Sequence, residues 1–200
     1  MAARAVQRAS SETHTRQRLV EVAVRLFSRH SFAGTSLQMI ADELGITKAA
    51  VYHHFRTREE LLTAVVEPVL SRMRAVVETA EAKRTPRARA EHVLAGYADL
   101  AVEHRAVVGF LACDAGVIEM LRARPETCDL IDRQLDLLAA VVPGPAGRVN
   151  AAMVLAGIAA AVGPARIDLG DDALREHLLE AGRRTLGLRA PRRPAVPAPM

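Results

Sequence analysis

Two short helices joined by a tight turn are the feature of this sequence that most restricts its fold. Residues 35–55 have the sequence TSLQMIADELGITKAAVYHHF. Gly45 permits the left-handed backbone of a sharp turn, and Ala41 is small enough for two helices to cross closely. The apolar side chains that would fill the space between the helices are Leu37, Ile40, Leu44, Ile46 and Val51. This spacing predicts a helix-turn-helix, with Leu26, Phe27 and Phe55 completing its core.

Capping residues predict where these helices begin. Thr35 followed by Gln38 fits a capping box at the first helix of the pair. Thr47 can cap the second helix, which has the sequence KAAVYHHF. Thr57 followed by Glu60 fits another capping box and predicts that a further helix starts at once after it.

The remaining segments are helical by the same criteria. An apolar stripe from Thr13 to about His30 predicts a first helix, and a long helix is expected over residues 58–83. Pro68 lies inside that long helix, where proline either bends or breaks the axis. Further helices are expected after Pro86 and Pro125 and at about 147–163 and 172–186. Because no segment alternates apolar and polar residues for long, we predict an all-α protein.

Composition supports this fold class. Half of the 200 residues are hydrophobic, but 3% are aromatic and Trp is absent, so aliphatic side chains must fill the core. The longest apolar run without a charge, residues 151–163, is too short to cross a bilayer. Cys113 and Cys128 form no paired motif, and the N-terminus lacks the apolar stretch of a signal peptide. We therefore expect a reduced, cytoplasmic chain with no membrane partner.

Positive charge is concentrated at the two ends of the chain. Residues 1–60 hold 9 basic and 6 acidic side chains, residues 61–186 hold 15 and 17, and residues 187–200 hold 3 and none. A basic N-terminal segment is typical of a module that binds a polyanion, although an excess this small also fits an ordinary solvated surface. Residues 1–11 are expected to be disordered, and the Pro- and Arg-rich residues 187–200 are expected to form a flexible tail.

The second helix of the pair is the candidate DNA reader. Lys48 lies on its first turn, where a cation reaches a guanine edge or a phosphate, and Ala50 leaves room for close approach. Tyr52 and His53 lie one turn further on and are candidates for phosphate contacts. Each residue also has an ordinary structural interpretation, since threonines cap helices, a tyrosine can be half-buried in a core, and histidines are common on surfaces. Adjacent histidines diverge on a helix, so we predict no metal site.

Residues 13–62 resemble the N-terminal domain of the TetR family of regulators. The matching stretches are TRQRLVEVAVRLFSRHSFAGTSL, IADELGITKAAVYHHF and TREELL. Ser31 stands where that family usually has glycine, so it is expected to accept a positive φ, and Arg58 replaces a common lysine. The resemblance implies DNA contacts at Thr35, Thr47, Lys48, Ala50, Tyr52, His53 and Arg58.

The resemblance also implies a domain organisation. It predicts a homodimer with a helix-turn-helix DNA-binding domain over residues 12–60 and a larger helical effector-binding and dimerisation domain over residues 61–186. A stripe of mostly small residues suggests where two copies meet, at Val149, Met153, Ala156, Ala160, Leu174, Leu178 and Ala181. Candidates for lining an effector pocket are Met73, Tyr97, His104, Phe110, Cys113, Met120 and Leu135. The alternative for either set is that it forms plain core of one subunit.

We therefore predict a repressor that binds a palindromic operator as a dimer and is released by a small-molecule effector. An activator, or a DNA-binding protein controlled by a protein partner, is an alternative that sequence does not separate from this one. A helical enzyme is a remote alternative, with Glu91-His92 and Cys113-Asp114 as the suggestive pairs. Neither pair converges on a helix, and no Gly-rich phosphate loop or G-x-S-x-G motif is present. We expect no enzymatic activity, no catalytic residues and no cofactor.

Overall fold

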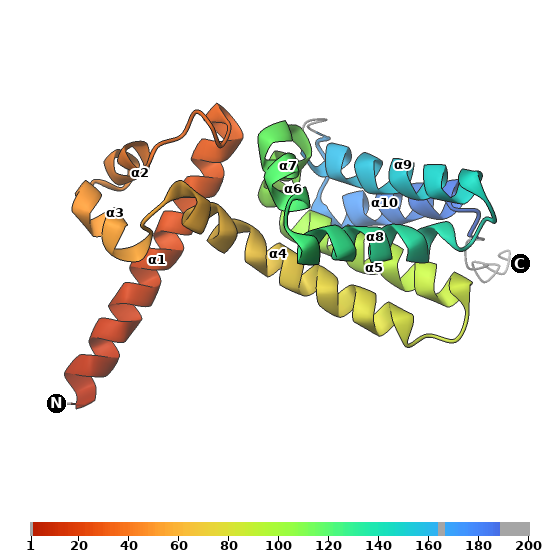
Figure 1. Cartoon of the computed structure of the whole chain (residues 1–200), viewed down its shortest axis with the longest axis horizontal. Helices are drawn as coiled ribbons and strands as arrows, with labels where there is room; N and C mark the ends of the chain where they lie inside the picture. The colour runs from red at the N-terminus through yellow and green to blue at the C-terminus, as the bar shows by residue number, and fades with distance from the viewer. Residues whose placement is uncertain (1, 164–166, 189–200) are drawn as a thin grey trace, which may run out of the picture.

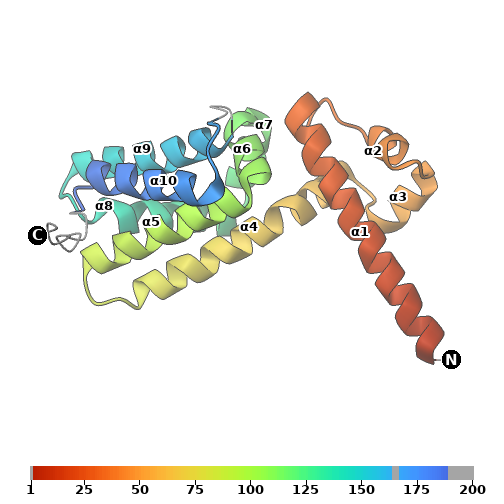
Figure 2. The ribbon, with the colours of Figure 1, turned by 180° about the vertical axis from the view of Figure 1, so that it is seen from behind.

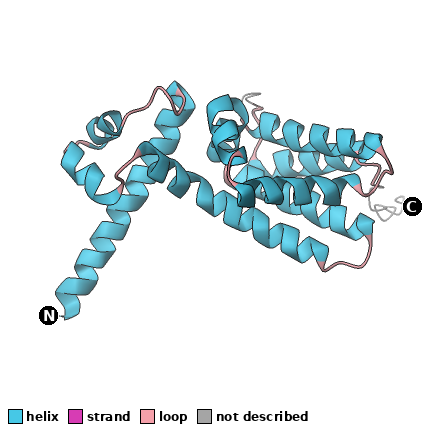
Figure 3. Ribbon diagram, in the orientation of Figure 1, coloured by secondary structure: helices cyan, strands magenta, loops and turns pink. Residues whose placement is uncertain are grey.

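The structure, a computed structural model, describes residues 2–163 and 167–188, with side chains from residue 12 onward. These residues form ten α-helices and no strand, which confirms the all-α prediction (Figure 3). The helices are α1 (Ala2–His30), α2 (Leu37–Leu44), α3 (Lys48–His54), α4 (Arg58–Glu81), α5 (Pro86–Glu103), α6 (Arg105–Cys113), α7 (Ala115–Arg122), α8 (Pro125–Ala139), α9 (Pro145–Val162) and α10 (Asp171–Thr185).

The helices form a small N-terminal lobe and a larger C-terminal bundle. Helices α1 to α3 make up the lobe, α5 to α10 gather in the bundle, and α4 runs from one to the other (Figure 1). The first half of α1 projects away from the rest of the molecule in both views (Figure 2). Helices α6 and α7 lie at the end of the bundle that faces the lobe, and α6 packs against α1.

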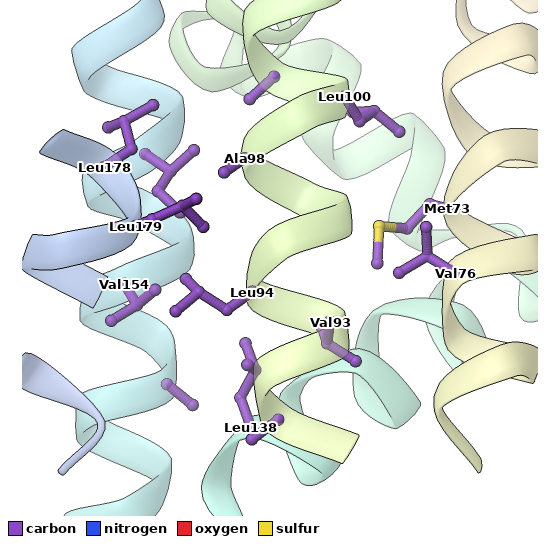
Figure 4. Packing of buried hydrophobic residues seen from close by; sticks show 14 of the residues in the cluster. Met73, Val76, Val93, Leu94, Ala98, Leu100, Leu138, Val154, Leu178 and Leu179 are labelled. Carbon is purple, nitrogen blue, oxygen red and sulfur yellow. The ribbon is translucent and has the colours of Figure 1, made fainter. Parts of the chain in front are cut away.

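Two hydrophobic cores correspond to these two parts. The N-terminal core contains the buried side chains of α1 to α3, including Phe27, Ile40 and Val51, as the apolar spacing predicts. It also takes in residues from outside the lobe, namely Leu61, Leu62, Val65, Val66, Phe110, Val117 and Leu121. The C-terminal core joins α4, α5, α8, α9 and α10, and part of it is drawn in Figure 4. The lobe is therefore packed against α6 and α7 as well as connected through α4.

Most of the predicted caps are present, but that of α2 is displaced by one residue. Ser36, not Thr35, is the N-cap, and its hydroxyl accepts a hydrogen bond from the Met39 amide at 3.1 Å. Gln38 donates to Asp42 at 2.7 Å instead of closing a capping box. Thr47 caps α3 and Thr57 caps α4, as predicted. The capping-box motif favours Thr35 because Gln38 lies three residues after it, but Thr35 is buried and its hydroxyl donates to the Ser31 carbonyl, which leaves Ser36 to cap the helix.

Both ends of the described chain are more ordered than predicted. Helix α1 begins at Ala2, so the expectation of disorder over residues 1–11 is wrong for residues 2–11. That segment lacks an apolar stripe, but it is rich in Ala and Arg, which favour helix on their own. After α10, Gly187 has φ 70° and Leu188 donates to the Arg183 carbonyl at 2.8 Å, which makes a Schellman cap and buries Leu188. The rest of the predicted tail, residues 189–200, lies outside the described residues.

The long fourth helix is not broken by its proline. Helix α4 continues for 24 residues through Pro68, which is exposed. At about 1.5 Å per residue it spans roughly 36 Å, long enough to belong to both cores. The open alternative of a break at Pro68 is therefore excluded, and α4 is one continuous connection between lobe and bundle.

Helix α9 has an unusual apolar surface. Its 18 residues have a mean hydropathy of 1.4, so the helix is long and apolar enough to cross a membrane by length and composition alone. Only 28% of these residues are buried inside the protein. Val149 and Met153 are 55% and 61% exposed. Apolar helices of this length also occur at interfaces between copies of a soluble chain. The exposed face is considered with the proposed function below.

A close crossing of α4 and α5 supplies a test of the packing. A Cβ added at Gly96 would lie 2.6 Å from a methyl group of Val76, a stiff β-branched residue. We expect Gly96→Ala to lower the free energy of unfolding by about 1–3 kcal/mol, measured by urea denaturation. Gly116→Ala, in α7, is the matched control because its Cβ would meet only ordinary contacts, so its stability should stay the same or rise slightly. Equal effects of the two changes would contradict the close crossing.

Candidate nucleic-acid interface

Helix α3 has one buried face and one exposed face. Val51 is fully buried in the N-terminal core, while Lys48 and His53 are exposed and Tyr52 is 45% exposed. The Lys48 ammonium lies 5.6 Å from the centroid of the Tyr52 ring, within range of a cation–π interaction. Thr47 caps the helix, and its hydroxyl accepts from the Ala50 amide at 3.2 Å. The leading end of α3 therefore faces outward, as a DNA reader requires.

A surface groove lies beside this exposed face. It has a volume of about 480 Å³ and is lined by residues 33–38 before and within α2, by Lys48 and Tyr52, and by residues 56–59 at the start of α4. The exposed lining residues that were not predicted as DNA contacts include Ser36, Gln38 and Arg56. These residues could not be identified from their positions in the sequence, because it is the turns of the lobe that bring them close to Lys48. Arg56 adds a second exposed cation to the edge of the groove.

Thr35 does not have the exposure that a DNA contact needs. The residue is 1% exposed, and its hydroxyl donates to the Ser31 carbonyl at 2.8 Å. Its backbone carbonyl accepts from Arg58 at 3.0 Å. The prediction of Thr35 as a DNA contact is therefore not supported, and the residue instead closes the turn that precedes α2.

Arg58 stabilises the same turn. Its Nη1 atom donates to three carbonyl oxygens, those of Phe32 at 3.1 Å, Ala33 at 3.1 Å and Thr35 at 3.0 Å. The guanidinium carbon also lies 5.0 Å from the centroid of the Phe32 ring. Nη1 is therefore engaged by the backbone of the turn, while Arg58 also lines the groove beside α3. Arg58 thus has a structural role, and its predicted phosphate contact stays a prediction.

The turn over residues 31–35 is strained and tied to the bundle. Ser31 has φ 63°, which confirms the positive φ expected of it. The Phe32 amide donates to the Asp114 carboxylate at 2.8 Å, across 82 positions of sequence. The other oxygen of Asp114 accepts from the Val117 amide at 3.1 Å and so caps α7. One carboxylate thus joins the start of the helix-turn-helix to the bundle.

The two histidines of α3 differ in environment. His53 is exposed and is available to a phosphate, whereas His54 is half-buried. Burial, the neighbouring His53 and Arg16 together lower the pKa of His54, although Glu12 opposes this shift. The rings lie 5.3 Å apart, and among the residues with described side chains no three His, Cys, Asp or Glu form a group that could hold a metal.

The predicted effector-pocket residues do not form one pocket. Met73, Tyr97 and Leu135 belong to the C-terminal core or pack against it, whereas Phe110 and Met120 lie with the N-terminal core. The Tyr97 hydroxyl donates to the Leu155 carbonyl at 3.4 Å, and burial raises the pKa of Tyr97 to about 12. Phe110 and Cys113 line a different cavity, beside α6, while His104 is not among its lining residues. Helical periodicity finds the apolar faces but not which face meets which.

The predicted interface residues are divided in a similar way. Val149, Met153, Ala156 and Ala181 are exposed, and Ala160 is half-buried. Leu174 and Leu178 are buried in the C-terminal core of the same subunit, and both also line the apolar surface between α9 and α10, so their place in a dimer interface stays a prediction. A largely apolar groove of about 350 Å³ runs between α9 and α10 and includes Met153, Ile158 and Leu169.

Comparison with known proteins places the lobe in a recognised class. A family model described as bacterial regulatory proteins, tetR family, matches residues 19–65. The regulator AcrR of Shigella flexneri is 42% identical over 53 residues, covering 26% of this chain and 25% of that protein. The repressor AcnR of Corynebacterium glutamicum is 32% identical over 65 residues, covering 32% and 35%. The chain therefore aligns with about a third or less of the length of these relatives.

Solved structures extend the likeness to the whole fold. KstR2 of Mycobacterium tuberculosis, described as a ketosteroid transcriptional regulator, superposes with a TM-score of 0.68 at 19% identity and covers 86% of this chain and 93% of that one. AmtR of Mycobacterium smegmatis gives a TM-score of 0.61 at 20% identity and covers 88% and 87%. At these identities the agreement concerns the fold alone.

The role of Arg58 can be separated from that of its neighbour Arg56. We expect Arg58→Ala to lower the free energy of unfolding by about 1–3 kcal/mol, because three carbonyls lose a charged donor. Arg56→Ala is the matched control, since that side chain is exposed and its loss should change stability by less than about 0.5 kcal/mol. Urea denaturation followed by circular dichroism measures both. Equal stabilities of the two variants would contradict the structural role of Arg58.

Proposed function

Because the chain belongs to the TetR family of bacterial regulatory proteins, we propose that it is a transcriptional repressor that binds operator DNA. The operator is palindromic, the binding form is a homodimer, and a small molecule releases it from DNA. The single observation that carries DNA binding is the outward face of α3, with Lys48 at its exposed leading end. Localisation in the cytoplasm follows from this function.

The exposed face of α3 has the chemistry of a major-groove reader. Lys48 supplies a cation for a guanine edge or a phosphate, and the small side chain of Ala50 lets the helix approach the major groove closely. Tyr52, His53 and Thr47 are placed to contact the DNA backbone on either side. Ser36, Gln38 and Arg56 extend the contact surface across the adjoining groove. In a dimer, two such helices would enter successive major grooves about 34–36 Å apart.

Helices α9 and α10 are the proposed dimer interface. Val149 and Met153 expose apolar side chains on α9, and Ile167 and Leu169 expose two more beside α10. The apolar groove between the helices adjoins these residues and would receive side chains of a second copy. An isologous contact of this kind joins two helices from each subunit and satisfies the apolar surface of α9 without a membrane.

Release by an effector requires a path from the bundle to the lobe, and two connections are available. Helix α4 contributes to both cores, and α6 and α7 pack directly on the lobe. A molecule that moves either connection would change the separation of the two α3 helices.

An activator is the alternative to a repressor. The two are distinguished by the position of the operator relative to the promoter.

The residues once considered for an enzyme have structural roles instead. Glu91 pairs with Arg183, and Asp114 accepts two backbone hydrogen bonds. His92 is partly buried, which lowers its pKa together with the charge of Lys83. No observation favours catalysis over DNA binding.

The reading role of Lys48 is tested with the other lysine of the chain as its control. Lys48→Ala should weaken binding to a palindromic operator, selected from the DNA upstream of the gene, by about 1–3 kcal/mol. Lys83 lies past the far end of α4, so Lys83→Ala should leave the affinity unchanged. Fluorescence anisotropy at fixed salt concentration compares the two. If both variants bind as tightly as the unaltered chain, Lys48 does not contact the operator.

The dimer proposal is tested on the exposed face of α9. Met153→Glu places a charge where the second copy would pack, and we expect it to weaken the dimer by at least about 2 kcal/mol. Ile131→Glu is the control, because Ile131 is an exposed apolar residue of α8, 37% exposed, outside the proposed interface. Sedimentation velocity reads the association state of each. A Met153→Glu variant that remains dimeric would exclude this face.

A further inference from the structure

A cavity runs along one face of α6, between the lobe and the bundle. Its lining residues on α6 and just after it are Arg105, Ala106, Gly109, Phe110, Cys113 and Asp114. These positions recur at the spacing of one helix face over the full length of α6. Phe27, Ser28 and Ser31 of α1 and its turn form the opposite wall, and Val162 and Gly163 complete it. We call this cavity, of about 620 Å³, the α6 groove.

The floor of the groove is apolar and narrow. Phe27 and Phe110 stack with ring centroids 5.5 Å apart and present buried aromatic surface. Gly109 and Gly163 approach so closely that a Cβ on either would contact the backbone of the other. Two glycines in this contact let α9 approach α6, and the Ala106 side chain adds little bulk. The middle of the groove therefore favours an unbranched, apolar segment.

The two ends of the groove carry opposite charges. Arg105 is the first residue of α6, and Asp114 follows its last residue. Nine helical residues span about 13 Å, so the two charged groups lie at opposite ends of the groove. A complementary molecule has an anionic head beside Arg105, an apolar middle and a cationic head beside Asp114.

Both charged groups have bonding capacity left for a ligand. Arg105 pairs with Asp171 at 2.6 Å, but the Asp171 side chain is 70% exposed, and exposed pairs of this kind contribute little stability. The Arg105 Nε atom is shielded from water and has no acceptor, so a small rotation that offers it an acceptor would be favourable. Asp114 accepts two backbone N–H groups, and no cation pairs with it among the ion pairs of the described residues.

We propose that the α6 groove binds an elongated zwitterion, with a carboxylate held by Arg105, an ammonium held by Asp114 and an unbranched apolar chain between them. Of the residues predicted to line an effector pocket, Phe110 and Cys113 line this groove, whereas Met73, Tyr97 and Leu135 lie in the C-terminal core or pack against it. The effect of the α6 groove on DNA rests on the proposed function. An ammonium at Asp114 competes with the Phe32 amide for the same carboxylate, so the ligand would loosen the turn that leads into the helix-turn-helix.

The two cysteines make binding measurable without DNA. Cys113 lines the groove and is exposed, while Cys128 is exposed on α8 outside it. The probe is 8-aminooctanoate, whose chain is slightly shorter than α6. Alkylation by N-ethylmaleimide is timed for Cys113 in a Cys128→Ser variant and for Cys128 in a Cys113→Ser variant. At a probe concentration about tenfold above its Kd, the rate at Cys113 should fall about tenfold and the rate at Cys128 should not change.

Matched compounds and variants decide the chemistry of the site. Octanoate and octylamine each lack one head, and 4-aminobutanoate is too short to reach both ends, so each should protect Cys113 at least about tenfold less well. Ala106→Phe should obstruct the groove and abolish protection, while Ala112→Phe, at an exposed position of α6 that does not line the groove, should preserve it. Equal protection of both cysteines, equal binding of all four compounds, or no protection at millimolar probe would overturn the proposal.

The same compound is then tested on operator complexes. Loss of DNA affinity with 8-aminooctanoate, absent in Ala106→Phe, supports the coupling through Asp114. If 8-aminooctanoate protects Cys113 but the protein binds no operator, the proposed repressor function is refuted and the groove proposal is still supported. If the protein binds an operator but 8-aminooctanoate does not protect Cys113, the groove proposal is refuted and the repressor function is still supported.

Discussion

The backbone of Phe32 is held from both sides, and the position of the whole reading surface depends on this. Its N–H donates to Asp114 of the bundle, and its carbonyl accepts from Arg58 of α4. The preceding residue, Ser31, is kept in a left-handed conformation that costs a non-glycine residue about 1–2 kcal/mol. The strained turn sets the direction in which the chain leaves α1, and therefore the positions of α2 and α3. Both anchors are hydrogen bonds to charged groups, which are stronger than bonds between neutral ones.

Local features of the lobe were predictable because neighbouring residues determine them. The turn at Gly45 and the caps at Thr47 and Thr57 each depend on a few adjacent positions, and all three are present. The positive φ of Ser31 followed instead from the family resemblance. The cap of α2 shows where this stops. The motif favours Thr35, which has Gln38 three residues after it, but the burial of Thr35 leaves the cap to Ser36.

The features that could not be predicted from the sequence depend on contacts between residues that are far apart in the chain. Nothing local indicates that Asp114 bonds to Phe32, or that Arg58 is held by three carbonyls. The same holds for Leu174 and Leu178, whose helical spacing predicts an apolar face but not whether a partner subunit or the same subunit covers it. The pocket residues failed for this reason as well. Seven positions form one pocket only if the helices turn them toward one another; Phe110 and Cys113 share a cavity, but Met73, Tyr97 and Leu135 pack with the C-terminal core.

The packing of the lobe on α6 and α7 changes how the molecule would transmit a signal. If α4 were the only connection, the lobe would swing on one helix, and small movements in the bundle would be lost in that motion. Phe110, Val117 and Leu121 instead extend the N-terminal core into the bundle, and Phe110 stacks directly on Phe27 of α1. Packed interfaces of this kind resist gradual deformation and switch between discrete arrangements. A displacement at α6 therefore reaches the turn before α2 through one layer of side chains, which makes the junction a more direct control point than the core of the bundle.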